Sequence, residues 1–329
     1  MILDGRLPQA IAEAVRVLCA GDLLGLPTET VYGLAADAAS DAAVAKIFAA
    51  KGRPSDHPLI VHVADAAGVA HFAASVPDFA QQLMNAFWPG PLTLILPRRP
   101  GVGAAAAGGQ DTIGLRCPSH PVAQAVLRAC VDAGMHGLAA PSANQFGRVS
   151  PTTAAHVQAE FGDRLLVLDG GACEVGIEST IIDCTRGVLV LLRPGRISRA
   201  QVEAACGQPL RAKEELAAPD PRASGTLEAH YAPTAKVRLM DARALQTALD
   251  LLGADAAHIA VYSRVILKTP SAGVIRRRMP DDAAATAQQL FAVLREFDAQ
   301  GVRLIWIETP PDTADWEGVR DRLQRAAAA

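Results

Sequence analysis

The spacing of hydrophobic residues changes between helical and extended patterns through the first 200 residues. Between Pro8 and Gly21, apolar residues recur at the i, i+3, i+4, i+7 spacing of an amphipathic helix. These residues are Ile11, Ala14, Val15 and Leu18. A second helix is predicted after Ser40, whose hydroxyl suits the N-cap position, and its last turn reaches Lys51.

Short aliphatic and β-branched runs predict strands between and after these helices. They lie at residues 23–27, 59–63, 92–96, 112–117, 137–140, 165–168, 179–184 and 188–193. So many extended segments in one region favour a large, mixed and twisted sheet. We therefore expect an α/β domain over residues 1–206.

The composition changes after residue 206. Residues 207–234 are rich in Pro, Ala, Gly and charge without sustained periodicity, which predicts a linker. Strand patterns at 236–240, 258–262 and 302–307 then alternate with helical patterns at 242–252, at 284–297 and from 315. This alternation predicts a small doubly wound domain with a parallel sheet over residues 235–329.

Composition limits the class of protein. Half of the 329 residues are apolar and a fifth are charged, which is typical of a globular protein. Charged residues interrupt the N-terminal apolar stretch, so neither a secretory leader nor a membrane span is predicted, and we expect a cytoplasmic protein. The formal charge of −3 gives no overall reason to bind nucleic acid. Six scattered cysteines favour buried free thiols over zinc ligands or disulfides.

The segment Lys51-Gly52-Arg53-Pro54 is the first candidate for chemistry. A Lys and an Arg beside a Pro could present two cations to a polyphosphate, because the two side chains bind phosphate in complementary ways. A solvated helix end, where the helix dipole favours cations, is the alternative. No G-x-x-x-x-G-K-[ST] or G-x-G-x-x-G motif offers another phosphate site, and no H-E-x-x-H or Ser-His-Asp pattern indicates zinc or covalent chemistry.

The predicted strand 112–116 is the second candidate. Its period of two puts Thr112, Gly114 and Arg116 on one face, where Gly114 leaves room beside a guanidinium that could hold a carboxylate. An ordinary surface strand fits the pattern as well.

Two further segments carry polar side chains after apolar runs. The turn Pro141-Ser142-Ala143-Asn144 displays a hydroxyl and a carboxamide, although both residues also favour turns for local reasons. His62 alternates with apolar neighbours, as a buried core histidine does.

In order and spacing, these segments and others resemble the Sua5/YrdC/YciO family. The matching blocks are P-T-E-T-V-Y-G-L (27–34), K-G-R-P (51–54), H-P-L-I-V-H (57–62), W-P-G-P-L-T (88–93), G-L-R (114–116), P-S-A-N (141–144), G-I-E-S-T (176–180) and R-P-G (193–195). H-Y-A-P (230–233) and D-R-L (321–323) extend the resemblance to the long, two-domain Sua5 type. The linker departs from the family pattern at 224–226, where S-G-T stands in place of Pro-Gly-Met.

The resemblance implies a YrdC-like domain with a twisted sheet around a basic cavity, followed by a small Rossmann-like domain. It implies a nucleotidyltransferase that condenses L-threonine, bicarbonate and ATP, with its Mg²⁺, into threonylcarbamoyl-AMP and pyrophosphate. A separate transferase complex then moves the threonylcarbamoyl group to adenosine 37 of tRNA, and a weak contact with tRNA is a further expectation. No membrane partner is expected.

The resemblance also implies roles for individual residues. The ATP phosphates and Mg²⁺ would be surrounded by Lys51, Arg53, Ser142, Asn144, Ser150, Arg193 and Thr112. His57, where many relatives carry Asn, would also contact ATP, and His230 and Tyr231 would cover the nucleotide. Threonine would be bound by Thr30, His62, Arg116, the Ala140 backbone and Ser179 or Thr180, with Arg116 on its carboxylate.

Two other functions are consistent with parts of these patterns. One is carbamoyl-adenylate formation, as in the related domain of hydrogenase maturation factors, although the zinc-finger cysteines and acylphosphatase domain of those proteins are absent here. The other is a double-stranded RNA-binding module that uses the same basic cavity, against which the net charge of −3 speaks.

Overall fold

A computed structural model describes residues 1–215 and 230–329, and the contacts within the chain divide it into two compact units. The first unit comprises Met1–Phe146 and the described residues from Ser150 to 215. The second comprises Gly147–Val149 and residues 230–329. Residues 224–226, where the linker departs from the family pattern, lie outside the described residues.

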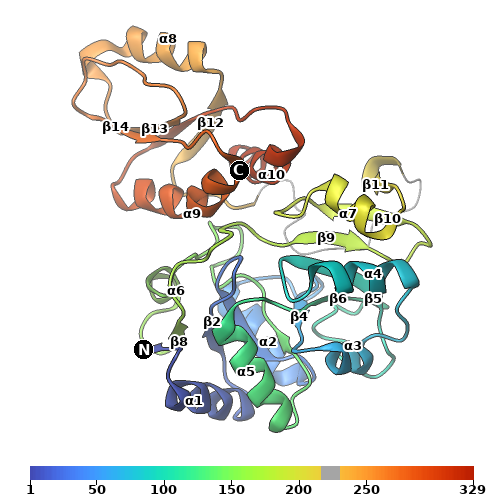
Figure 1. Cartoon of the computed structure of the whole chain (residues 1–329). Helices are drawn as coiled ribbons and strands as arrows, with labels where there is room; N and C mark the ends of the chain where they lie inside the picture. Colours follow the sequence, from blue (N-terminus) through green and yellow to red (C-terminus); the bar gives the residue numbers. More distant parts are fainter. Residues whose placement is uncertain (216–229) are drawn as a thin grey trace. The chain divides into compact units, whose positions relative to one another are not determined.

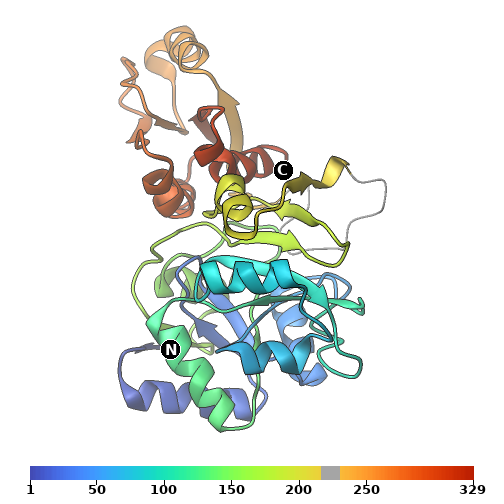
Figure 2. The same cartoon turned by 45° about the vertical axis from the view of Figure 1, so that its right-hand side comes forward.

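The first unit is built on one mixed sheet with 11 strands among the described residues, which confirms the predicted α/β fold with a large mixed sheet (Figures 1 and 2). In spatial order they are β1 (Ile2–Asp4), β8 (Leu166–Asp169), β2 (Leu24–Leu26), β3 (Gly33–Asp37), β7 (Leu138–Ala139), β4 (Ile60–His62), β6 (Thr112–Arg116), β5 (Leu92–Pro97), β9 (Thr180–Asp183), β10 (Leu189–Arg193) and β11 (Leu210–Ala212). The N-terminus lies beside β8 because β1 pairs with it in parallel (Figure 1). Strand β11 falls within the segment predicted as a linker.

Helices pack on both faces of this sheet. They are α1 (Pro8–Cys19), α2 (Asp41–Lys51), α3 (Ala66–Phe72), α4 (Asp78–Phe87), α5 (Pro121–Asp132), α6 (Ala154–Phe161) and α7 (Arg199–Cys206). Only α1 and α2 were predicted individually. One apolar cluster joins α1 and α5 to β2 and β8, and a larger one joins α2, α3 and α4 to β3, β4, β5 and β6. The sheet is therefore buried on both faces over most of its width.

Capping residues fix both ends of α2, and the helix ends at the K-G-R-P segment. The Ser40 hydroxyl accepts a hydrogen bond from the amide of Ala43 and starts the helix. Gly52 ends it in the left-handed region at φ 61°, which a residue with a Cβ adopts only at a cost. The helix therefore ends at Lys51, and the left-handed Gly52 changes the direction of the chain before Arg53.

The second unit has a four-stranded sheet with all neighbouring strands parallel, which agrees with the predicted small doubly wound fold. Its strands are, in spatial order, β12 (Lys236–Met240), β15 (Leu304–Glu308), β13 (Ile259–Ser263) and β14 (Val274–Arg278). Helix α8 (Ala242–Leu252) covers one face, and α9 (Ala283–Ala299) and α10 (Glu317–Ala327) cover the other (Figure 1). The sequence pattern did not reveal β14.

The cysteines only partly follow the prediction. Cys117, Cys130, Cys173 and Cys184 are buried free thiols, but Cys19 is exposed, because it lies at the end of α1 on the face turned from the sheet. None of the helices in the described ranges combines the length and apolarity needed to span a bilayer.

Candidate functional site

A row of polar side chains crosses the middle of the first sheet on one face. His62 of β4 is in register with Arg116 of β6, and the pairing of β6 with β5 brings Thr93 to the next position. Thr93 is in register with Ile181 of β9. Because partners in register point to the same side of a sheet, these four strands contribute to one surface. Arg193 of β10 lies opposite Ile181 at a shift of register after Leu191, and it joins this surface through its hydrogen bonds to Ser179. The predicted split of strand 112–116 into two faces is confirmed.

Arg116 is fixed in this row by the turn before β3. Its Nη1 donates a hydrogen bond to Thr30 Oγ1 at 2.7 Å, and its Nη2 lies 2.7 Å from Glu29 Oε1. The side chains of Arg116 and Glu29 are each only 4% exposed, so this is a buried ion pair rather than a surface one. Thr28 stabilises the turn by accepting from the amide of Thr30 and donating to the carbonyl of Val31 at 2.6 Å. The T-E-T sequence therefore orients the guanidinium.

Burial and the charge of Arg116 together set the protonation of Glu29 and His62. Burial by itself would raise the pKa of Glu29, but attraction to Arg116 overcomes it and the pKa falls below 4.5. Burial, followed by the charge of Arg116, lowers the pKa of His62 to about 3. His62 is therefore neutral at physiological pH, beside a guanidinium and a carboxylate that are both charged.

His62 also carries an unsatisfied polar atom. Its side chain is buried, and its Nδ1 has no hydrogen-bond partner among the residues that the structure describes. Buried polar atoms without partners are uncommon and call for a physical explanation. The predicted burial of His62 is confirmed, and a ligand group would satisfy its Nδ1.

Ser179 extends the polar row toward β10. Its hydroxyl lies 2.7 Å from Thr93 Oγ1 and accepts a hydrogen bond from Arg193 Nη2 at 3.2 Å, while its carbonyl accepts from Arg193 Nη2 at 2.9 Å. Thr180 instead exchanges hydrogen bonds with the backbone of Ile197 at 2.9 and 3.2 Å. Of these two neighbouring hydroxyls, Ser179 is the one that joins the network of site residues.

Gly195 allows this approach of the chain after β10. A Cβ at this position would lie 2.5 Å from the amide nitrogen of Thr180 and 2.8 Å from the carbonyl oxygen of Glu178. Backbone atoms cannot move aside as a flexible side chain can, so the R-P-G segment needs glycine here. The close contact holds Arg193 and Ser179 together.

Lys51 is not the solvated helix end that one interpretation of its motif allowed. It is 2% exposed, and its Nζ donates hydrogen bonds to the carbonyl oxygens of Ser142, at 2.5 Å, and Asn144. Burial, followed by the charge of Arg53, lowers its pKa to about 7. The ammonium group thus fixes the Pro141–Asn144 turn against α2 and retains one N–H beyond these two.

Arg53 and His57 flank the same turn. Arg53 is 7% exposed, its Nη2 donates to the carbonyl of Pro58 at 3.1 Å, and its guanidinium carbon lies 5.6 Å from the ring centre of Phe146. The His57 ring meets Phe146 edge-on at 5.7 Å. Two segments far apart in sequence, 51–57 and 141–146, thus form one basic cluster.

Strand β3 connects this basic cluster to the polar row. Gly33 bridges to Ser142, and the amide of Ala143 donates to the carbonyl of Tyr32 at 2.8 Å, only two residues beyond Thr30. The amide of Ala140 donates to the carbonyl of Ile60 at 3.0 Å. This N–H is therefore already paired, and only the carbonyl of Ala140 can serve the predicted contact with threonine.

Other predicted site residues are placed less centrally. The Ser150 hydroxyl donates to Glu178 Oε1 at 2.5 Å, next to Ser179. Thr112 lies at the opposite end of β6 from Arg116, roughly 13 Å along the strand for four residues. The space expected over Gly114 is filled, because a Cβ there would lie 3.2 Å from Ile95 Cδ1 and 3.6 Å from Ile60 Cγ1. That expectation of room for a ligand is wrong.

His230 and Tyr231 belong to the second unit. The amide of His230 donates to the carbonyl of Arg325 at 3.3 Å. The Tyr231 ring stacks on Phe291 at 5.4 Å, and Arg322 lies 5.3 Å from its centre. The two C-terminal blocks noted in the sequence, H-Y-A-P and D-R-L, therefore pack together.

Three contributors to the site were not assigned from the sequence. Glu29, Thr93 and Glu178 each lie inside a recognised block, but no role was given to them. The available signal was the carboxylate of Glu29, which stands between two threonines just after the predicted strand 23–27, because a carboxylate that becomes buried requires a cation.

Comparisons with known proteins agree with this architecture in both units. The Sua5/YciO/YrdC family model, described as "Telomere recombination", matches residues 16–195. The model described as "Threonylcarbamoyl-AMP synthase, C-terminal domain" matches residues 197–328. The chain is 38% identical to a threonylcarbamoyl-AMP synthase of Bacillus subtilis over 96% of this chain and 92% of that protein. It is 34% identical to one of Pyrococcus abyssi over 93% of this chain and 91% of the relative.

Solved structures give the same result. P. abyssi Sua5 in complex with L-threonine matches with a TM-score of 0.87 and 34% identity, over 96% of this chain and 94% of the other. A P. abyssi Sua5 variant in which adjacent His and Tyr residues are replaced by alanine matches with a TM-score of 0.90 and 32% identity, over 99% and 96% of the two chains.

Proposed function

The chain belongs to the Sua5/YrdC/YciO family in its two-domain form, and we propose that it condenses L-threonine, bicarbonate and ATP into threonylcarbamoyl-AMP and pyrophosphate. The observation that carries this proposal is that the similarity to threonylcarbamoyl-AMP synthases extends through both units rather than one domain. The activity belongs to the nucleotidyltransferases. Its product is the activated precursor of a tRNA modification.

The polar row is suited to an amino acid. Arg116 offers a fixed cation for the threonine carboxylate, and the neutral His62 offers Nδ1 to the hydroxyl or amine. Glu29 balances the buried guanidinium before threonine binds and keeps it in one orientation. Thr30 and Ser179 complete the polar surroundings. A bound threonine would supply the hydrogen bond that His62 lacks.

The basic cluster is suited to the phosphates of ATP. Arg53 and Lys51 provide two cations, and Lys51 positions the turn that carries Ser142 and Asn144. Mg²⁺ accompanies ATP as part of the substrate, and the oxygen-bearing side chains of this turn are of the type that Mg²⁺ accepts. Arg193, Ser150 and His57 are proposed to contact ATP as well, and His230 and Tyr231 to cover the nucleotide.

Proximity and charge neutralisation account for the chemistry. The threonine amine attacks the carbon of bicarbonate and water is lost, which gives a carbamate. A carbamate oxygen then attacks the α-phosphorus, the bond to the β-phosphate breaks, and pyrophosphate leaves with the charge stabilised by Arg53 and Lys51. Positioning of this kind is worth about 7 kcal/mol or more of the barrier. The ammonium proton of threonine passes to solvent before the first step, and the second step requires no general base in the protein because the carbamate is already an anion.

We also propose how the product is used. The mixed anhydride hydrolyses readily, so its threonylcarbamoyl group passes to a separate transferase complex that modifies adenosine 37 of tRNA. A weak contact between this chain and tRNA would assist the transfer, and the cytoplasm is the compartment where such a transfer takes place.

Pyrophosphate release tests the proposal and separates it from its rivals. With Mg-ATP, we expect release only when threonine and bicarbonate are both present. An enzyme that forms carbamoyl adenylate would instead require carbamoyl phosphate, and an RNA-binding module would release none. Release that does not depend on threonine would contradict the proposal.

A further inference from the structure

The second unit contains a feature that the proposed activity does not use. Strands β13 and β14 are parallel neighbours, and the chain leaves their carboxyl ends toward opposite faces of the sheet. After β13 it runs over the α8 face, where the backbone of Lys268 exchanges hydrogen bonds with the Gln246 side chain at 2.8 and 2.9 Å. After β14 it enters α9 on the other face. Ligands of doubly wound sheets bind at such a divergence of connections.

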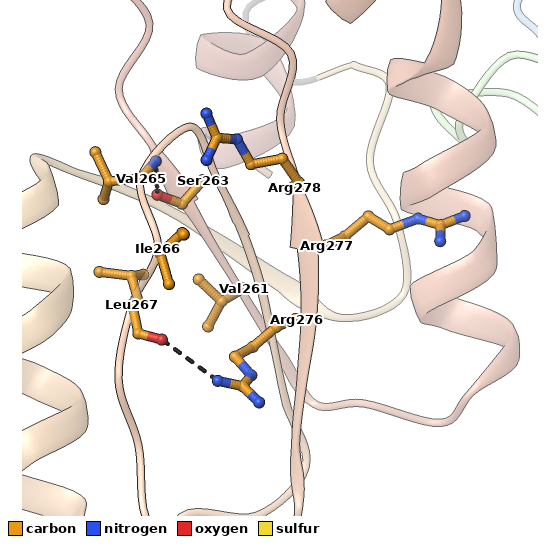
Figure 3. A pocket seen from close by; sticks show the side chains of 8 residues that line it. All are labelled: Val261, Ser263, Val265, Ile266, Leu267, Arg276, Arg277 and Arg278. Carbon is orange, nitrogen blue, oxygen red and sulfur yellow. Dashed lines mark hydrogen bonds between the residues drawn. The ribbon is translucent and has the colours of Figure 1, made fainter.

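A pocket of about 320 Å³ lies at this divergence (Figure 3). Its floor is the α8 face of the two strands, where Val261 is in register with Arg276 and Ser263 with Arg278. The loop after β13 forms its wall with Ile266 and Leu267. One side of the pocket is thus apolar and the other carries guanidinium groups, which is the lining expected for a small organic anion.

The three consecutive arginines of β14 are not equivalent. In Figure 3, Arg276 and Arg278 extend toward the loop after β13, whereas Arg277 points away from it. Arg277 pairs with Glu296 of α9 on the opposite face, at 2.9 Å. Arg278 pairs with Asp281 at 3.0 Å, but their side chains are 55% and 73% exposed, so this pair holds the guanidinium only weakly.

Arg276 is the least neutralised cation of the pocket. Its Nη1 donates to the carbonyl of Leu267 at 3.4 Å, and it forms no ion pair with any residue in 1–215 or 230–329. Ile266 is 83% exposed at the rim of the same pocket. A cation without a counter-charge, next to exposed apolar surface, fits a ligand that has both an anionic and an apolar part.

We propose that this pocket binds a nucleoside phosphate, with Arg276 and Arg278 on the phosphate and Val261 and Leu267 against the nucleoside. A lone phosphate would leave the apolar wall unused in a pocket of about 320 Å³, a size suited to small-molecule ligands. An RNA strand would require a continuous basic surface, whereas Arg277, the middle arginine of β14, faces α9. All of its lining residues belong to the second unit, and none of them is among the residues assigned to threonine or ATP.

Charged side chains on an edge strand can also serve to prevent sheets from pairing edge to edge. A comparison with Arg277 distinguishes this role from ligand binding. Arg277 has the same charge on the same strand but lies on the opposite face. Arg277→Ala is therefore a matched control for changes at Arg276 and Arg278. All three arginines are exposed, so these substitutions are expected to leave the fold intact.

Equilibrium dialysis of the full-length chain against radiolabelled AMP tests the proposal. The chain and its Arg277→Ala variant should bind one more AMP per chain than the double variant Arg276→Ala/Arg278→Ala. Arg276→Gln alone should weaken this binding roughly tenfold or more, the loss expected for a charge-assisted hydrogen bond. Any AMP bound in the first unit is the same in all variants and does not affect the difference between them. The result is therefore independent of whether the proposed catalytic function is correct.

Three results would overturn the proposal. The first is that all variants bind the same number of AMP molecules per chain while they keep the melting temperature of the unaltered chain. The second is an equal loss of AMP in Arg277→Ala. The third is that binding of a short RNA depends on Arg276, whereas binding of AMP does not. Should the double variant melt early, Arg276→Gln alone decides the outcome through its affinity relative to Arg277→Ala.

Discussion

Replacing Glu29 by glutamine tests the buried ion pair that orients Arg116. The change keeps the size of the side chain and removes its charge, so Arg116 is left buried at 4% exposure without its partner at 2.7 Å. Removing one member of a buried pair costs about 3 to 5 kcal/mol, because the remaining charge is not solvated. We expect a loss of this size in the local stability of β4 and β6 at neutral pH.

The loss of stability in Glu29→Gln should depend on pH in a defined direction. The pKa of Glu29 in the folded chain lies below its ordinary value of 4.5, so the ion pair contributes its full stability above pH 4.5. That contribution is lost as the pH falls through the lowered value and the carboxylate is protonated. The stability difference between the unaltered chain and Glu29→Gln should therefore be largest near neutral pH and shrink in acid.

Amide hydrogen exchange of peptides from β4 and β6 measures this local stability without requiring the two units to unfold together. Glu13→Gln is a suitable control, since Glu13 pairs with Arg16 at 2.6 Å on the exposed face of α1, and it should cause no measurable change. The double variant Glu29→Gln/Arg116→Met should be more stable than Glu29→Gln alone. A loss below about 1 kcal/mol, or one that does not change with pH, would refute the reasoning.

Other changes test the remaining parts of the site. Arg116→Ala should raise the threonine KM by roughly tenfold or more with little change in the ATP KM, and steady-state kinetics in which only the ATP KM rises would show that the carboxylate lies elsewhere. Arg53→Ala should abolish adenylate formation while circular dichroism stays unchanged, and near-normal turnover would exclude its role on the phosphates. Because the pKa of Lys51 is about 7 in the free chain and bound phosphates favour the ammonium form, ATP affinity should fall as the pH rises above 7. Titrations of Lys51→Arg should show a much flatter dependence, and an unchanged slope would contradict this. Gly195→Ala should reduce both stability and activity, because its Cβ would meet backbone atoms at 2.5 Å, whereas a normal melting temperature would show that the chain adapts.

The sequence predicted the parts of the fold in which periodicity and burial coincide. In α1, Ala14 and Leu18 of the apolar stripe are fully buried, and in β6 the alternation separates Leu115 from Arg116 as expected. Strand β14 was missed because three arginines replace its apolar alternation, a pattern that edge strands tolerate and local sequence does not reveal. Strand β3 was missed because it is buried between two neighbours and shows no polar alternation.

The site was predictable as a set of residues but not as a network. Lys51 could be placed at a helix end, yet its burial against the Ser142 carbonyl depends on a turn 91 residues away. The pairing of Arg116 with Glu29 likewise follows from how the sheet brings β6 beside the turn before β3, which local spacing cannot show. Contacts between distant segments show that Lys51 is not a solvated helix end and that the strand carrying Arg116 is not an ordinary surface strand.

The most direct test of the central claim is the fate of carbon from bicarbonate. The full-length chain is incubated with Mg-ATP, L-threonine and ¹³C-bicarbonate, and the adenylate product is weighed by mass spectrometry. The account predicts an adenylate that carries the threonine residue and one ¹³C atom, and none when either threonine or bicarbonate is omitted. An adenylate that forms without the label would contradict it.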